Sequence, residues 1–109
     1  LKNFFQSHIV RLQKNDVLFS FGMPSSSVYF IVDGQIKTTI NRHERVFHNN
    51  QYFGELSVIN NTKRLGEAVV VSDWAKIIKI PNSTFKRLLG EDLEFQNYIL
   101  KNLNKIIIN

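Results

Sequence analysis

The sequence contains no cysteine among its 109 residues, which excludes disulfide bonds, thiolate metal ligands and a cysteine nucleophile. It has no apolar run near the roughly 20 residues that a membrane-spanning helix needs. No secretory signal is recognisable at its start, so a cytoplasmic location is the default and we expect no membrane insertion. Its three histidines (His8, His43 and His48) lack the spacing of a metal-binding set. We therefore expect no enzymatic activity, no metal and no resident cofactor, and a metal-dependent enzyme is the least favoured alternative.

A block of like charge is also missing, although the chain is basic. Fourteen Lys and Arg against nine Asp and Glu give a net charge of +5. A basic chain can bind nucleic acid or an anionic membrane. Here the positive residues are spread along the sequence without a run of about five or six like charges. We interpret them as a solvated surface that attracts an anionic ligand, and we expect no direct nucleic-acid binding by this segment.

The length suits one domain with one core, and hydrophobic alternation predicts that most of it is β-structure. Residues 1–8 are expected to form a short helix with Phe4 and Phe5 facing the core. Close, regular spacing of short strands is typical of a sandwich, jelly roll or barrel. The prediction is a mainly β fold with flanking helices, an eight-stranded antiparallel jelly-roll (β-roll). Its recognisable strands lie near residues 10–13, 17–21, 28–32, 35–40, 45–48, 68–71 and 76–80.

Two polar segments separate the central strands. Asp33-Gly34 is the strongest turn signal and predicts a two-residue hairpin between the strands on either side of it. A second polar turn is predicted over residues 41–44.

The periodicity becomes helical after Pro81. Residues 81–84 carry the signals of a helix start, and Gly90 is expected to end that helix. Glu91-Asp92 place negative charge where a second helix would begin, which favours its dipole. We expect this second helix to continue past Asn109. Its apolar stripe comprises Phe95, Ile99, Leu103, Ile106 and Ile107.

The stretch from Tyr52 to Arg64 differs from the strands around it. Gly54 has no Cβ and lets a backbone approach a ligand closely. Glu55 and Ser57 can begin a short helix whose free N–H groups attract an anion. Arg64 offers a planar fork of donors suited to a phosphate. This combination predicts a site for a ligand that carries both hydroxyl groups and a phosphate.

Residues 53–57 followed by Arg64 resemble the phosphate-binding cassette of the cyclic-nucleotide-binding domain. This module is shared by the regulatory subunits of cAMP-dependent protein kinase, cyclic-nucleotide-gated channels and the bacterial catabolite activator family. Gly22 and the segment 28–34 are similar to the same family's signature hairpin. The resemblance implies one domain over 1–109. Its parts would be an N-terminal helix at 1–8, a β-roll at 9–81 with the cassette at 53–65, and hinge and lid helices at 82–109.

The resemblance also implies a role for each cassette residue. Glu55 would accept the ribose 2′-hydroxyl, and Arg64 would pair with the cyclic phosphate. The N–H groups around Gly54, Leu56 and Ser57 would add neutral donors.

The base of the ligand depends on other positions. A hydroxyl-bearing residue after the cassette arginine is associated with guanine recognition in this family, whereas this chain has Leu65. The expected ligand is therefore cAMP more than cGMP. Phe47, on the strand before the cassette, is a candidate base contact and also a candidate core residue.

Two functions remain open at this point. In the first, the domain is a sensor that transmits occupancy through its C-terminal helix to an output domain outside this chain, with a homodimer among its expected assemblies. In the second, the domain binds no nucleotide and serves as a dimerisation or docking module. Glu67 favours the second, because it would repel the phosphate if it faced the pocket, whereas small residues and Ser or Thr are usual in the family after Leu65. Asn50-Gln51 also departs from the pattern that usually precedes the cassette aromatic.

Overall fold

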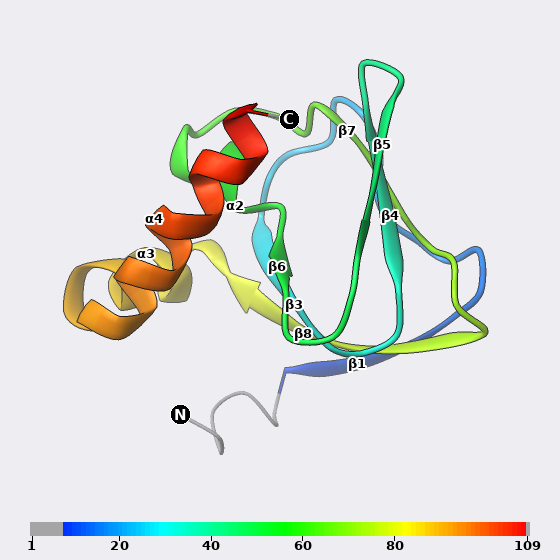
Figure 1. Cartoon of the computed structure of the whole chain (residues 1–109), viewed down its shortest axis with the longest axis horizontal. Coiled ribbons are helices and arrows are strands. Elements are labelled where there is room, and N and C mark those ends of the chain that lie inside the picture. The colour runs from blue at the N-terminus through cyan, green and yellow to red at the C-terminus, as the bar shows by residue number, and fades with distance from the viewer. Residues whose placement is uncertain (1–7, 109) are drawn as a thin grey trace.

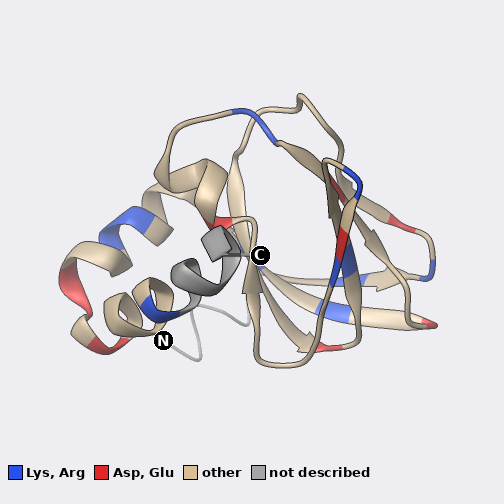
Figure 2. Cartoon of the chain, turned by 45° about the horizontal axis from the view of Figure 1, so that its top comes forward, with Lys and Arg blue, Asp and Glu red and all other residues tan. Residues whose placement is uncertain are grey.

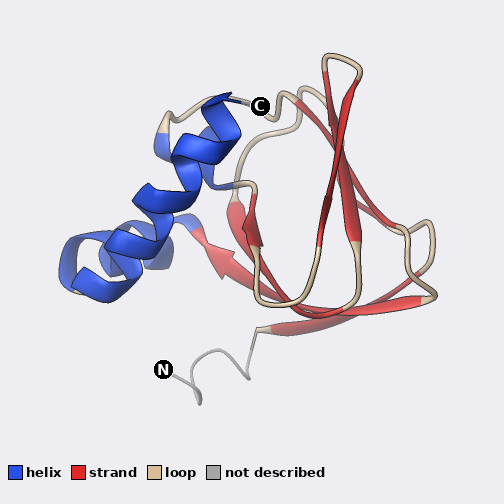
Figure 3. Ribbon diagram, in the orientation of Figure 1, coloured by secondary structure: helices blue, strands red, loops and turns tan. Residues whose placement is uncertain are grey.

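The computed structural model describes residues 8–108, with side chains described as far as Lys101. Two antiparallel four-stranded sheets form a β-roll, and helices cover one side of it (Figures 1 and 3). This confirms the eight-stranded antiparallel prediction. The helix predicted over residues 1–8 lies outside the described residues, except for His8.

Each sheet combines strands from distant parts of the sequence. The first sheet has the order β1-β8-β3-β6, and the second has the order β2-β7-β4-β5. The strands of the first are β1 (Ile9–Gln13), β8 (Trp74–Pro81), β3 (Ser27–Asp33) and β6 (Tyr52–Phe53). Those of the second are β2 (Val17–Phe19), β7 (Gly66–Val70), β4 (Ile36–Ile40) and β5 (His43–Phe47).

The hairpin predicted at Asp33-Gly34 is wrong. β3 pairs with β8 and β6, whereas β4 pairs with β5 and β7, so the chain crosses from one sheet to the other at this turn. Gly34 has a φ of +118°, and a Cβ there would lie 2.8 Å from the Cβ of Ala75. A turn signal reports a local change of direction and contains no information about which strand the chain pairs with next.

The tight hairpin lies one strand later, at Asn41-Arg42. Both residues have positive φ values, 49° and 68°, as a two-residue turn that matches the twist of its strands requires. β5 consequently begins at His43, inside the predicted polar turn, and pairs with β4 along its whole length.

The inner faces of the two sheets enclose the main core. Side chains of β3 alternate, so Tyr29 and Ile31 point into this core and Val28 points to the other face. β8 is likewise buried on both faces, with Ile77 inside the roll and Ile80 under the helices. Burial on both faces explains why these strands read as continuous apolar runs rather than alternating ones.

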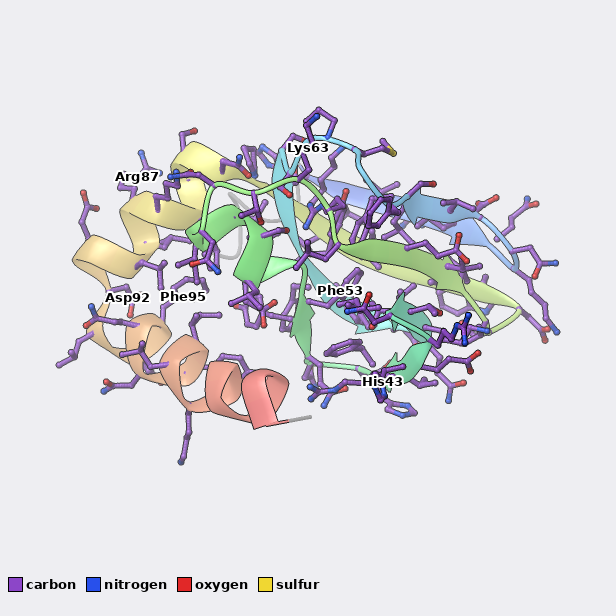
Figure 4. The ribbon with its side chains drawn as sticks, turned by 90° about the horizontal axis from the view of Figure 1, so that it is seen from above. His43, Phe53, Lys63, Arg87, Asp92 and Phe95 are labelled. Carbon is purple, nitrogen blue, oxygen red and sulfur yellow. The ribbon has the colours of Figure 1, made fainter. Side chains whose placement is uncertain are left out.

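Two helices cover the outer face of the first sheet. α3 (Asn82–Glu91) and α4 (Leu93–Ile108) pack there through a second apolar cluster that includes Phe85 and Ile99. α3 extends one residue past Gly90, and Asp92 separates the two helices. The carboxylate of Asp92 accepts the N–H of Phe95 at 3.0 Å, so the acidic start predicted for the last helix is confirmed (Figure 4).

Substitutions of two glycines, one on β7 and one on α3, should change the free energy of unfolding in opposite directions. A Cβ at Gly66 would collide with the carbonyl oxygen of Thr39 on β4, so Gly66→Ala should lower the free energy of unfolding by about 1–3 kcal/mol. A Cβ at Gly90 meets no atom within 4 Å, so Gly90→Ala should raise it by about 0.5–1 kcal/mol. Urea unfolding of the two variants measures both shifts. A Gly66→Ala variant as stable as the parent would contradict the close approach of β7 to β4.

Candidate functional site

A cavity of about 490 Å³ opens between the β4–β5 hairpin and the cassette, residues 53–65. Its volume is in the range of typical small-molecule sites. In Figure 4, His43 marks the hairpin side of this region, Phe53 begins the cassette and Lys63 lies near its end. The cavity brings together every site residue predicted from the sequence: Phe47, Gly54, Glu55, Leu56, Ser57, Arg64 and Leu65.

Gly54 shapes the cassette for Arg64. It precedes the short helix α2 (Glu55–Ile59) with a left-handed φ of 82°. A Cβ at this position would lie 2.8 Å from Nη1 of Arg64, and the Gly54 carbonyl accepts a hydrogen bond from the same nitrogen at 2.8 Å. The absence of a side chain at Gly54 therefore makes room for the guanidinium of Arg64. From the sequence we expected the same absence to let the backbone approach a ligand.

The guanidinium of Arg64 is buried, and its side chain is held by neutral acceptors. Nη1 also donates to the hydroxyl of Ser57 at 3.0 Å, and Nη2 donates to the carbonyl of Ser27. The group lies over the ring of Phe19, 4.1 Å from its centroid. Burial lowers the pKa of Arg64, while Tyr29 and Glu55 oppose that shift.

None of the described carboxylates forms an ion pair within 4.0 Å of this guanidinium. Among the described residues, the ion pair within 4.0 Å is that of Lys37 with Glu44, at 3.8 Å on the outer face of the second sheet. Buried charges are stable only when they are paired or well hydrogen-bonded. The positive charge of Arg64 is thus stabilised by dipoles and remains available to an anion.

Glu55 is a buried acid, and one of its carboxylate oxygens lacks a hydrogen-bond donor among the described residues. Its side chain is 1% exposed, and Oε2 has no hydrogen-bond partner among the described residues. Burial raises the pKa of Glu55 to about 7, although its own N–H, Arg45 and Arg64 act in the opposite direction. An unsatisfied buried carboxylate oxygen is costly and needs a donor, which a ligand hydroxyl can supply.

Arg45 is a site residue that sequence reasoning missed. It lies on β5, and its guanidinium stacks on the ring of Phe47 at 4.6 Å. Its Nη1 is buried and has no hydrogen-bond partner among the described residues. Arg45 and Phe47 share the inward face of β5 because side chains alternate along a strand. Because Phe47 was already a candidate site residue, the alternation of side chains along the strand could have identified Arg45, two residues before it.

Leu65, just before β7, and Glu67, on β7, both border the cavity, and both are exposed. Leu65 is 49% exposed at the mouth of the cavity. Glu67 borders the cavity but is exposed, and it alternates with Gly66 and Ala68, which are buried. Its side chain therefore lies on the outer face of β7, which is the arrangement in which Glu67 would not repel a phosphate.

The remaining charges of the described residues lie on several different elements. Figure 2 shows Lys and Arg distributed over helices, loops and strands of both sheets. Within residues 8–101, His, Asp and Glu do not gather in a group of three that could hold a metal ion. The described helices also include none that is long and apolar enough to cross a bilayer.

Solved structures share this fold. A structure described as "A cyclic-GMP-dependent signalling pathway regulates bacterial phytopathogenesis" superposes with a TM-score of 0.78 at 21% identity, covering 99% of this chain and 91% of that one. The regulatory domain of Toxoplasma gondii PKA with cAMP gives a TM-score of 0.73 at 19% identity, over 89% of this chain and 38% of that one. The cGMP-bound EAL enzyme Bd1971 gives 0.71 at 16% identity, over 91% of this chain and 28% of that one. At these identities the likeness establishes the fold.

The family is established from the sequence itself. No curated protein sequence matches the chain. The family model described as "Cyclic nucleotide-binding domain" matches residues 9–92, which include both sheets, the cassette and α3. This match covers most of the chain, and it includes the cassette residues that line the cavity. The chain belongs to the cyclic nucleotide-binding domain family.

Proposed function

We propose that this domain is a regulatory sensor that binds a cyclic nucleotide and has no catalytic role of its own. The observation that carries the proposal is the pair of buried charged groups in one cavity. Among the described residues, Oε2 of Glu55 has no hydrogen-bond donor, and the guanidinium of Arg64 is held by neutral oxygens without a carboxylate within 4.0 Å. A ligand with a ribose hydroxyl and an anionic phosphate satisfies both groups at once.

Each part of the ligand has a partner in this arrangement. The ionised carboxylate of Glu55 accepts the 2′-hydroxyl. Arg64 donates to the phosphate, a charge-assisted interaction that is stronger than its present bonds to neutral oxygens. The N–H groups around Gly54, Leu56 and Ser57 lie at the cavity wall and add neutral donors.

Two observations favour different bases. Leu65 offers no hydroxyl to the edge of guanine, which supports cAMP, the ligand expected from the sequence. Arg45 supports cGMP as a second candidate, because its buried Nη1 lacks an acceptor. Guanine presents two acceptors that an arginine can bind together, whereas adenine presents a donor beside its acceptor.

In this proposal, the response to nucleotide binding is produced by an output domain or a regulatory partner outside this chain. The solved structures of the T. gondii PKA regulatory domain and of Bd1971 are longer than this chain, which spans 38% and 28% of them. Their size supports a domain that transmits occupancy through α4 to an output domain or a regulatory partner, with a homodimer as one assembly. The alternative is a nucleotide-independent docking module. Isothermal titration that detects neither cAMP nor cGMP binding at millimolar concentration would establish that alternative.

Substitution of Arg64 tests the phosphate site. Arg64→Lys keeps the charge but removes the forked donors, so its affinity for the nucleotide should fall roughly 10- to 100-fold, the range expected for a lost charge-assisted hydrogen bond. Lys63→Ala is the control, because Lys63 is exposed and this substitution removes a positive charge one residue from Arg64. Isothermal titration measures both variants, with circular dichroism to check folding. A loss of affinity in Lys63→Ala without a loss in Arg64→Lys would mean that the ligand responds only to general charge.

The pH dependence of binding tests the role of Glu55. Because its pKa in the free domain is about 7, the carboxyl is largely protonated at pH 6 and ionised at pH 8. The ionised form accepts the ribose hydroxyl, so binding should release a proton. Affinity should therefore rise with pH through this window, by up to about tenfold per unit below the pKa, and level off above it. Glu55→Gln should bind weakly and without this dependence. A flat profile for the parent chain would exclude an acceptor role for the ionised Glu55.

Arg45→Ala decides between the two bases. If Arg45 binds guanine, the variant should lose roughly tenfold or more in affinity for cGMP while cAMP binding changes little. Arg42→Ala, at the exposed end of the same hairpin, is the charge-matched control. Competition of the two nucleotides for the parent chain gives the reference. Tighter cAMP binding together with a neutral Arg45→Ala would assign the preference to adenine.

A further inference from the structure

The segment 22–27, between β2 and β3, is hydrogen-bonded to the end of the cassette. The N–H of Gly22 donates to the carbonyl of Arg64, and the N–H of Arg64 donates to the carbonyl of Met23, both at 2.8 Å. The hydroxyl of Ser25 donates to the carbonyl of Thr62 at 2.7 Å. Residues 62–64 are therefore fixed to this segment along its length.

The same segment is bonded to the start of α3. The side-chain amide of Asn82 donates to the carbonyl of Ser25 at 2.5 Å, and the N–H of Asn82 donates to the carbonyl of Ser26 at 3.1 Å. Ser25 thus binds the cassette through its hydroxyl and the helix through its carbonyl. Residues far apart in the sequence, Thr62 and Asn82, are joined through a single serine.

Arg64 links the ligand cavity to these hydrogen bonds. Its Nη2 donates to the carbonyl of Ser27, the first residue of β3, which pairs with Pro81 directly before α3. A phosphate in the cavity competes with Ser27 and Gly54 for the donors of Arg64. A guanidinium that turned toward the phosphate would pull on the main chain at 62–64 and, through its hydrogen bonds, on the segment bonded to it.

We propose that Ser25 couples occupancy of the cavity to the position of α3, through the chain of hydrogen bonds from Thr62 to Ser25 to Asn82. This inference rests on the proposed nucleotide binding for its physiological trigger. The connection itself belongs to the free domain and can be tested without a ligand. Coupling of this kind is reciprocal, so a change at α3 also changes the cassette.

The ligand-free test uses hydrogen–deuterium exchange of the 109-residue chain. Asn82→Asp removes the donor to Ser25, keeps the shape of the side chain and favours the N-terminus of α3. The amides of Thr62 and Arg64 should then exchange about fivefold faster, the effect of one net hydrogen bond. Unchanged exchange at both amides, in a variant whose α3 is intact by circular dichroism, would overturn the connection.

The ligand test uses Ser25→Ala with Ser26→Ala as its matched control. Ser26 is exposed and contributes its carbonyl, which alanine retains. With cAMP or cGMP bound to saturation, the change in exchange across α3 should be about fivefold smaller in Ser25→Ala than in the parent, and unaltered in Ser26→Ala. The double variant of Ser25→Ala and Asn82→Asp should show no more than the larger single effect, because both act on one connection.

The outcomes separate the two proposals. A parent chain that binds neither nucleotide contradicts the proposed function, while the ligand-free test still decides the connection. A chain that binds nucleotide, and whose Ser25→Ala variant responds in α3 as the parent does, overturns the coupling and leaves the function intact. Equal losses in Ser25→Ala and Ser26→Ala would overturn the specific role of Ser25.

Discussion

The buried guanidinium of Arg64 is the group on which the arrangement of the site depends. It binds Gly54 and Ser57 at the two ends of the first turn of α2 and Ser27 at the start of β3. Gly54 has a left-handed backbone and no Cβ, and both properties are needed to admit this side chain. Neutral oxygens and the ring of Phe19 stabilise the charge without neutralising it. The cassette is thereby held in shape while its strongest anion-binding group keeps its charge.

The two-sided burial of the first sheet connects this site to the helices. β3 contributes Tyr29 to the core beneath the cassette and Val28 to the cluster that holds α3 and α4. Aromatic contacts continue from this sheet onto the last helix, where Tyr52 packs against Phe95 with ring centroids 5.4 Å apart. The cassette and the helices are therefore connected through one close-packed layer.

Sequence reasoning succeeded where the information was local. The cassette residues are neighbours in the chain, so their shared chemistry was visible before their positions were known, and the structure places them around one cavity. It failed at Asp33-Gly34, because a turn signal does not say which sheet the next strand enters. Arg45 was missed because alternation places it on the same face as Phe47, and that face is known to border a cavity only once the strands are assembled. The bond between Ser25 and Asn82 joins residues 57 positions apart, and pairing at that distance leaves no trace in one sequence.

The different partners of Arg64 and Glu55 have a consequence for how this domain can diverge. Arg64 holds three elements of the fold together, so a descendant that no longer bound nucleotide would still lose stability by replacing it. Oε2 of Glu55 binds none of the described residues, and its burial is a cost that selection for stability alone would remove. In a lineage drifting away from its ligand, the acid should disappear first and the arginine persist. The carboxylate, more than the arginine, is therefore the residue whose presence reports a working receptor.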